Sequence, residues 1–119
     1  MRLVALAILL TLFSSCTDSS EVVVRVPEPK NLLSQEKFTE ILTEMAKLEG
    51  HIEQKYASAT KYHKMMINSG DSLLSNFKID KAVFESSMDY YGSRQELMQS
   101  IYDDVLDELN EELGELESE

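Results

Sequence analysis

Apolar residues recur at spacings of three and four through most of the chain after residue 33, which is the period of an amphipathic helix. The first such stretch begins at Ser34, whose hydroxyl can cap a helix, with Glu36 adding a negative charge to the first turn. We expect this long helix to continue until residues 68–71 (Asn-Ser-Gly-Asp), a combination typical of turns, interrupt it. Its apolar face consists of Phe38, Ile41, Leu42, Met45, Leu48, Ile52 and Tyr56.

The middle of the chain predicts two shorter helices. Asp71 can cap a short connecting segment that ends near Phe77, and Asp80 can cap the helix that follows. Gly92 is expected to end that helix in the left-handed conformation. Ser87 lies within the apolar face, where we interpret it as a small residue that allows close packing rather than as a nucleophile. The face consists of Val83, Phe84, Ser87, Met88 and Tyr91.

The last helix is predicted to begin with a capping box. Ser93 and Glu96 have the spacing at which each side chain satisfies the other residue's backbone N–H group. Its end is expected to fray, because Gly114 and the acids of residues 115–119 disfavour a helix C-terminus. The predicted inner face is Leu97, Ile101, Tyr102, Val105, Leu106, Leu109 and Leu113.

The pattern therefore predicts an all-α protein, with the helical domain at residues 34–113 and an acidic tail at residues 114–119. The expected architecture is a small up-and-down helical bundle of three main helices plus a short connecting helix. A signal peptide and an extended tether precede it.

The beginning of the chain has a different pattern. Arg2 is followed by an unbroken apolar run at residues 3–13, then by two serines and Cys16, which is the order of a secretory signal peptide. A helix of that length spans only about 16 Å, against the ~30 Å hydrocarbon core of a bilayer. Residues 12–16 (LFSSC) resemble the lipobox of bacterial lipoproteins, in which the cysteine thiol is lipidated and becomes the new N-terminus. We expect residues 1–15 to be the signal peptide and Cys16 to be the lipidation site.

Residues 16–33 are expected to form the lipidated N-terminus and a tether. Pro27 and Pro29 favour an extended backbone. The β-branched run at residues 22–26 is compatible with a short edge strand, but the chain shows no second strand with which it could pair. We therefore favour an extended segment that lies on the domain or on a partner.

Cysteine content and charge limit the possible functions. Cys16 is the only cysteine, which excludes an internal disulfide; a buried free thiol that only packs is the alternative to lipidation, and its position disfavours it. The formal charge is −11, and it becomes −12 when Arg2 is removed with the signal peptide. So acidic a chain is a poor candidate for binding nucleic acid or anionic lipid head groups.

The sequence shows no pattern typical of a catalytic or metal site. His51 and His63 are twelve residues apart and have no cysteine partner, so we expect no metal and no cofactor. The residue types of a hydrolytic triad occur, but without a G-x-S-x-G elbow or a sheet to present it. These residues are His63, Ser86, Ser87 and Asp89.

Four stretches together resemble the family called domain of unknown function 4296, which consists of small lipoproteins of Bacteroidota. They share its proline-led entry, its long first helix, its F-x-S-S-x-x-Y-Y segment and its I-Y-x-x-V-L helix. The resemblance implies an all-helical domain and a location in the cell envelope, and it implies no activity because the family has none assigned. The stretches are residues 27–49, 77–80, 84–91 and 101–106.

We therefore expect a lipid-anchored, non-catalytic interaction module of the bacterial cell envelope, which binds another envelope protein. Cys16 would hold it in a membrane, with the outer membrane favoured over the inner. The alternative is a small-molecule or glycan-binding lipoprotein subunit that serves a transporter, which a deep apolar pocket would favour. An enzyme that uses carboxylates within the bundle ranks last.

The end of the last helix also carries an expectation about oligomeric state. Leu106, Leu109, Leu113 and Leu116 fall at a and d positions of a heptad. Acidic residues flank them, so two copies of this helix would set like charges against each other. We expect a monomer at neutral pH, with the leucines either folded back on the domain or available to a basic partner helix.

Overall fold

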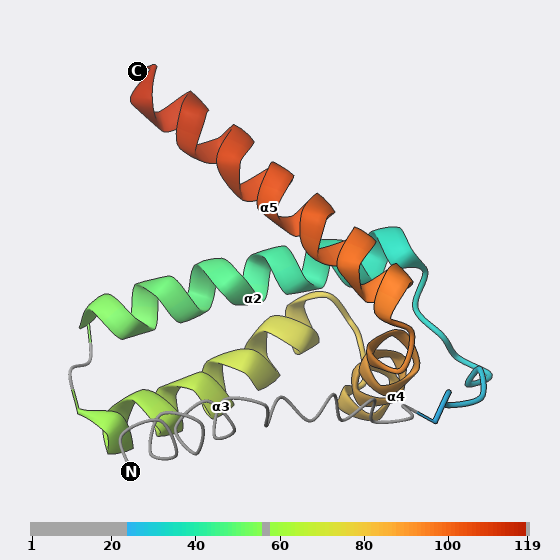
Figure 1. The fold of residues 1–119 in the computed structure, drawn as a ribbon. Coiled ribbons are helices and arrows are strands. Elements are labelled where there is room, and N and C mark those ends of the chain that lie inside the picture. The colour runs from blue at the N-terminus through green and yellow to red at the C-terminus, as the bar shows by residue number, and fades with distance from the viewer. Residues whose placement is uncertain (1–23, 56–57, 119) are drawn as a thin grey trace, which may run out of the picture.

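The computed structural model describes residues 24–55 and 58–118, so the signal peptide, Cys16 and Tyr56 lie outside the described residues. This part of the chain forms helices and no strand, which confirms the all-α class (Figure 1). Helices α2 and α3 lie side by side and antiparallel, and α5 crosses α2 and then projects beyond it. The helices are α2 (Gln35–Lys55), α3 (Ala59–Asn76), α4 (Lys81–Gly92) and α5 (Gln95–Glu117).

The predicted break at residues 68–71 is wrong, because α3 runs through this stretch and the chain leaves α2 after Lys55. Two serine side chains bond back to helix carbonyls instead of ending the helix: Ser72 Oγ donates to Asn68 O (2.9 Å) and Ser75 Oγ to Asp71 O (2.9 Å). One turn further on, Leu74 is buried in the core. Packing of this face therefore outweighs the low helix propensity of the turn-like residues.

The core is centred on Phe38, whose side chain is fully buried. Its ring stacks on Tyr91 at 4.9 Å between centroids and lies 5.6 Å from Phe84, so three aromatic side chains join α2 to α4. The hydrophobic core and the apolar side chains packed on it extend from Leu32 to Leu109, so a chain that begins at residue 17 retains all of it. The buried cluster consists of Leu33, Phe38, Ile41, Leu74, Phe84, Tyr91, Ile101 and Val105.

Two predicted caps are confirmed. Ser34 Oγ accepts a hydrogen bond from the backbone N–H of Lys37 (3.2 Å) at the start of α2. Asp80 Oδ1 accepts one from the backbone N–H of Ala82 (2.8 Å) at the start of α4. Both bonds satisfy N–H groups that a helix leaves unpaired in its first turn.

The predicted left-handed cap at Gly92 is wrong, because no glycine in the described chain has a positive φ. A left-handed cap closes α3 instead, with Lys78 at φ 57°. The backbone N–H of Lys78 donates to Ser75 O (3.0 Å), and that of Ile79 donates to Leu74 O (2.9 Å). These two bonds are those of a Schellman motif, which satisfies the last carbonyls of a helix.

The predicted capping box is also wrong, because the N-cap of α5 is Arg94 and no side chain caps this helix. The Ser93 hydroxyl has other partners: it donates to Tyr90 O (2.9 Å) and accepts from the backbone N–H of Val26 (3.0 Å). Arg94 Nη1 donates to Val26 O (3.0 Å), and its guanidinium group lies 3.7 Å from the centroid of the Tyr90 ring. Ser93 and Arg94 therefore bind the N-terminal segment at Val26, and their side chains do not cap α5.

Residues 24–33 contain no helix or strand and turn at residues 30–31, and they are bonded to Ser87 of α4 and to Ser93 just after it, so this segment lies on the domain. Leu33 is its second point of attachment. The backbone N–H of Leu33 donates to Ser87 Oγ (3.1 Å), and the Tyr91 hydroxyl donates to Leu33 O (2.7 Å). Burial raises the pKa of the Tyr91 phenol, which stays protonated as a donor at neutral pH. Ser87 is fully buried, so it permits close packing as predicted and also fastens this segment.

Candidate interaction surfaces

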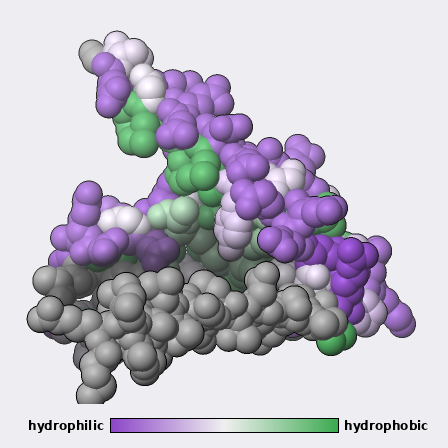
Figure 2. Space-filling view, viewed as in Figure 1, coloured by the Kyte–Doolittle hydropathy of each residue, from purple (hydrophilic) through white to green (hydrophobic). Residues whose placement is uncertain are grey.

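The outer half of α5 presents apolar side chains to solvent. The exposed fractions are 58% for Leu106, 58% for Leu113 and 69% for Leu116, while Leu109 is partly buried on the core. We call these four residues the leucine stripe. Figure 2 shows apolar surface on the helix that projects from the molecule. Three of the four leucines are therefore not folded back on their own domain within the described structure.

The inner face predicted for α5 is correct at Leu97, Ile101, Val105 and Leu109, which are buried or packed on the core, and wrong at its other members. Ile101 and Val105 are buried, whereas Tyr102 is 52% exposed and Leu106 and Leu113 lie in the stripe. The cause is the packing geometry, since α5 packs on α2 and α4 along the side that carries Ile101, Val105 and Leu109. It keeps contact with α2 as far as Glu112 and then projects past it (Figure 1). An amphipathic pattern states which side of a helix is apolar, but it does not state how much of that side another helix covers.

Contacts between α5 and α2 hold the projecting helix in this direction. Thr43 Oγ1 donates to Glu108 Oε2 at 2.7 Å. One turn further along each helix, Lys47 Nζ pairs with Glu112 on α5 and with Glu44 on α2. Hydrogen bonds to Glu112 and Glu44 raise the pKa of Lys47, so the lysine is fully charged at neutral pH. These structural roles cannot be predicted from the sequence, because partners 65 residues apart leave no local pattern.

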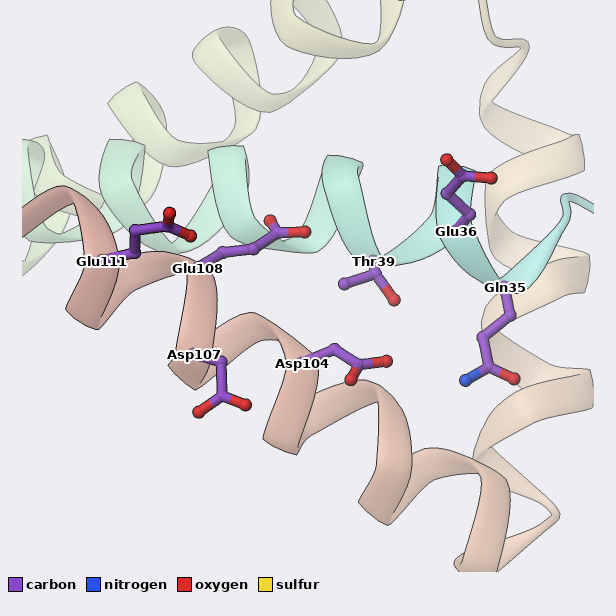
Figure 3. A pocket seen from close by; sticks show the side chains of 7 residues that line it. All are labelled: Gln35, Glu36, Thr39, Asp104, Asp107, Glu108 and Glu111. Atoms are coloured by element: carbon purple, nitrogen blue, oxygen red, sulfur yellow. The ribbon is translucent and has the colours of Figure 1, made fainter.

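A second surface lies on another side of α5, where this helix meets the first turns of α2. Five of the side chains that line it are carboxylates, and no Lys, Arg or His is among the lining residues. Figure 3 shows Thr39 and Glu108 where the two helices meet, whereas Glu36 and Asp107 point outward from α2 and α5. We call this surface the acidic groove, and it is lined by Gln35, Glu36, Thr39, Asp104, Asp107, Glu108 and Glu111.

Thr39 is the unusual member of the groove. It is only 4% exposed, and its Oγ1 is a buried side-chain atom in the described structure for which no hydrogen-bond partner is found. Thr43 Oγ1, one turn later, lies within hydrogen-bonding distance of both Thr39 O (3.0 Å) and Glu108 Oε2 (2.7 Å), which share its single proton. Figure 3 shows the Thr39 oxygen directed from α2 into the space between the two helices.

The residues considered for catalysis or metal binding do not form a site. His51 lies on α2 and His63 on α3, and both are exposed. The Ser86 and Ser87 hydroxyls each donate to Val83 O, at 3.0 and 2.8 Å. Among the residues that the structure describes, no three His, Cys, Asp or Glu side chains converge as they would around a metal ion. Within the same residues, no helix combines the length and the apolar character needed to cross a membrane.

The sequence profile of the family described as domain of unknown function (DUF4296) matches residues 29–115. The chain belongs to this family. The DUF4296 match confirms the resemblance seen in the sequence, and it spans α2 to α4 and most of α5. The acidic groove and three of the four leucines of the stripe lie within the DUF4296 region. No curated protein and no solved structure matches the chain.

Proposed function

We propose that this protein is a lipid-anchored, non-catalytic interaction module of the bacterial cell envelope, which binds another envelope protein. The observation that carries the proposal is the exposed leucine stripe on the projecting half of α5. Apolar side chains gathered on one side of a helix and exposed to water are typical of a docking surface. The fixed direction of α5, held by Glu108 and Glu112, keeps this surface available.

The chemistry of the stripe indicates the kind of partner. With Leu106 at an a position, Glu112 falls at a g position and Glu117 at an e position, beside the leucines. A partner helix with its own apolar stripe and with lysine or arginine at its edges would bury the leucines and pair with Glu117, while Glu112 already pairs with Lys47. A second copy of this chain would set acids against acids at neutral pH, so we propose that the protein is a monomer there.

The anchor limits where the partner can lie. Residues 24–33 are docked on α4, so only residues 17–23 separate the proposed lipid at Cys16 from the domain. Seven residues span at most roughly 25 Å when fully extended. The negative charge gives the domain no attraction to anionic head groups. The partner would therefore present its basic helix close to the membrane surface, on the side that carries the lipid.

The alternative function, a small-molecule or glycan-binding subunit of a transporter, has less support. Such a subunit needs a deep and mainly apolar pocket with a few polar groups to orient the ligand. The acidic groove is instead lined mainly by carboxylates. We therefore retain the interaction module as the proposal.

Sedimentation tests whether the stripe pairs with itself or with a basic helix. We expect residues 17–119 to sediment as a monomer at neutral pH and low salt. Self-association should appear in molar salt or at about pH 4, where carboxylates are screened or protonated. A synthetic helix with leucines at a and d positions and lysines at their edges should form a one-to-one complex at neutral pH.

Two pairs of substitutions, neither of which changes the net charge, test whether the synthetic helix binds at the leucine stripe. The pair Leu106→Asn and Leu113→Asn should abolish binding of the synthetic helix, because both leucines lose their apolar contact. The pair Gln54→Ser and Asn76→Ser, at exposed positions of α2 and α3, should leave it intact. A tight dimer at neutral pH and low salt, or equal binding by both pairs, would contradict the proposal.

A further inference from the structure

The acidic groove combines carboxylates that no basic lining residue neutralises with the Thr39 hydroxyl, for which no hydrogen-bond partner is found. Glu36 comes from the first turn of α2, and Asp104, Asp107 and Glu111 come from one side of α5, so carboxylates of two helices line one groove. In Figure 3, Asp104 lies nearest to Thr39, while Glu36 and Asp107 point outward at the edges. Salt bridges elsewhere on α2 neutralise acids with lysines, but no basic side chain lines this groove. Cations that enter from outside would therefore be strongly favoured here.

The buried Thr39 hydroxyl points to a ligand that carries N–H groups. It lies in the wall of the groove, directed toward α5, and no partner is found for its oxygen. Buried hydroxyl groups are nearly always hydrogen-bonded in folded proteins. A small rotation of this side chain would let the oxygen accept from an N–H donor placed between the carboxylates.

The spacing of the carboxylates distinguishes among cations. A metal ion needs ligands that converge on one point, and no such group occurs among the described residues. Asp104 and Glu111 lie seven residues apart on α5, which is about 10 Å along the helix axis. Guanidinium groups suit this arrangement, because each has five N–H donors and can bind a carboxylate through two of them while reaching a further acceptor.

We propose that the acidic groove binds arginine side chains of an extended basic segment in a partner protein. Two arginines with two residues between them lie on the same face of a polyproline II segment, which has three residues per turn. They are about 9 Å apart there, which is close to the distance from Asp104 to Glu111. The inference rests on the proposed function in taking a protein as the source of the arginines. It uses a different surface, since Glu111 and Leu113 point roughly 160° apart around α5.

Nuclear magnetic resonance can locate the binding. The probe is the blocked peptide Gly-Arg-Ala-Ala-Arg-Gly, added at low salt to isotope-labelled residues 17–119. We expect amide shifts at residues 35–39 and 104–111, and we expect none from the same peptide with citrulline in place of arginine. Thr39→Val should weaken binding at least about threefold while the rest of the spectrum stays that of the folded protein, because it removes one hydrogen bond from a charged donor and keeps the shape.

Two pairs of substitutions distinguish the effect of the groove carboxylates on peptide binding from the effect of the protein's net charge. Asp104→Asn with Glu111→Gln should weaken peptide binding at least about tenfold. Glu85→Gln with Asp89→Asn removes the same charge from exposed positions of α4 and should weaken it less than about twofold. Equal weakening by the two pairs, or shifts confined to the leucine stripe, would overturn the inference. Failure of the stripe to bind the synthetic helix would instead count against the proposed function, and these peptide results would still stand.

Discussion

Ile101→Asp is expected to unfold the helical domain. The Ile101 side chain is fully buried where α5 packs into the core, and no basic group lies in the core cluster to pair with a carboxylate there. The substitution removes buried apolar contacts, at a typical cost of roughly 2–5 kcal/mol, and it adds an unpaired buried charge. A domain of this size has about 5–15 kcal/mol of stability in total. Circular dichroism during heating would show little or no helical transition.

The matched control is the same change on the exposed side of the same helix. Leu113 is 58% exposed, so Leu113→Asp should alter the free energy of unfolding by no more than about 0.5 kcal/mol. Glu111→Ala, at another exposed position, should also be nearly neutral. Equal melting temperatures for Ile101→Asp and the unaltered chain would show that α5 does not pack as described.

Cys16→Ala is expected to abolish membrane attachment completely. The proposed anchor is one thioether-linked lipid group on the only cysteine of the chain, so no other residue can replace it. Mass spectrometry of the mature protein should show an N-terminus at Cys16 that carries acyl chains. The variant should lose these chains and leave the membrane fraction.

Ser19→Ala, three residues beyond the cysteine, serves as the control and should be lipidated normally. A Cys16→Ala protein that is still cleaved after residue 15 and still sediments with membranes would rule out the lipid anchor.

Features that depend on neighbouring residues were predictable from the sequence. The caps at Ser34 and Asp80 need only a side-chain oxygen and an N–H group two or three residues away. The buried faces of α2 and α4, with Phe38 and Phe84 in the core, follow from the helical period. Both kinds of feature are local, so their energies can be judged from short stretches of sequence.

The remaining features depend on distant partners. The Ser93 hydroxyl accepts a hydrogen bond from Val26, 67 residues away, and does not form the predicted capping box. Helix α3 passes through its turn-like residues because Leu74 packs in the core. Lys78 adopts the left-handed conformation that glycine usually adopts, so its cap has no signal in the sequence. In each case tertiary contacts outweigh local preference.

The two candidate surfaces were predictable to different degrees. The leucine spacing indicated the stripe and its acidic edges, but the exposure of Leu106 and Leu113 depends on the angle at which α5 crosses α2. The acidic groove was not predicted, because it joins Glu36 and Thr39 of α2 to carboxylates of α5. Abundant acids in a sequence do not indicate which of them will face one another.

Photo-crosslinking in intact cells, from position 113, tests the interaction module most directly. A photoreactive phenylalanine analogue in place of Leu113 lies in the leucine stripe, and the same analogue in place of Glu85 lies on the exposed side of α4. The proposal predicts one discrete envelope protein joined at position 113, absent at position 85 and lost when Leu106→Asn is added. No adduct at position 113, or the same adducts at both positions, would contradict it.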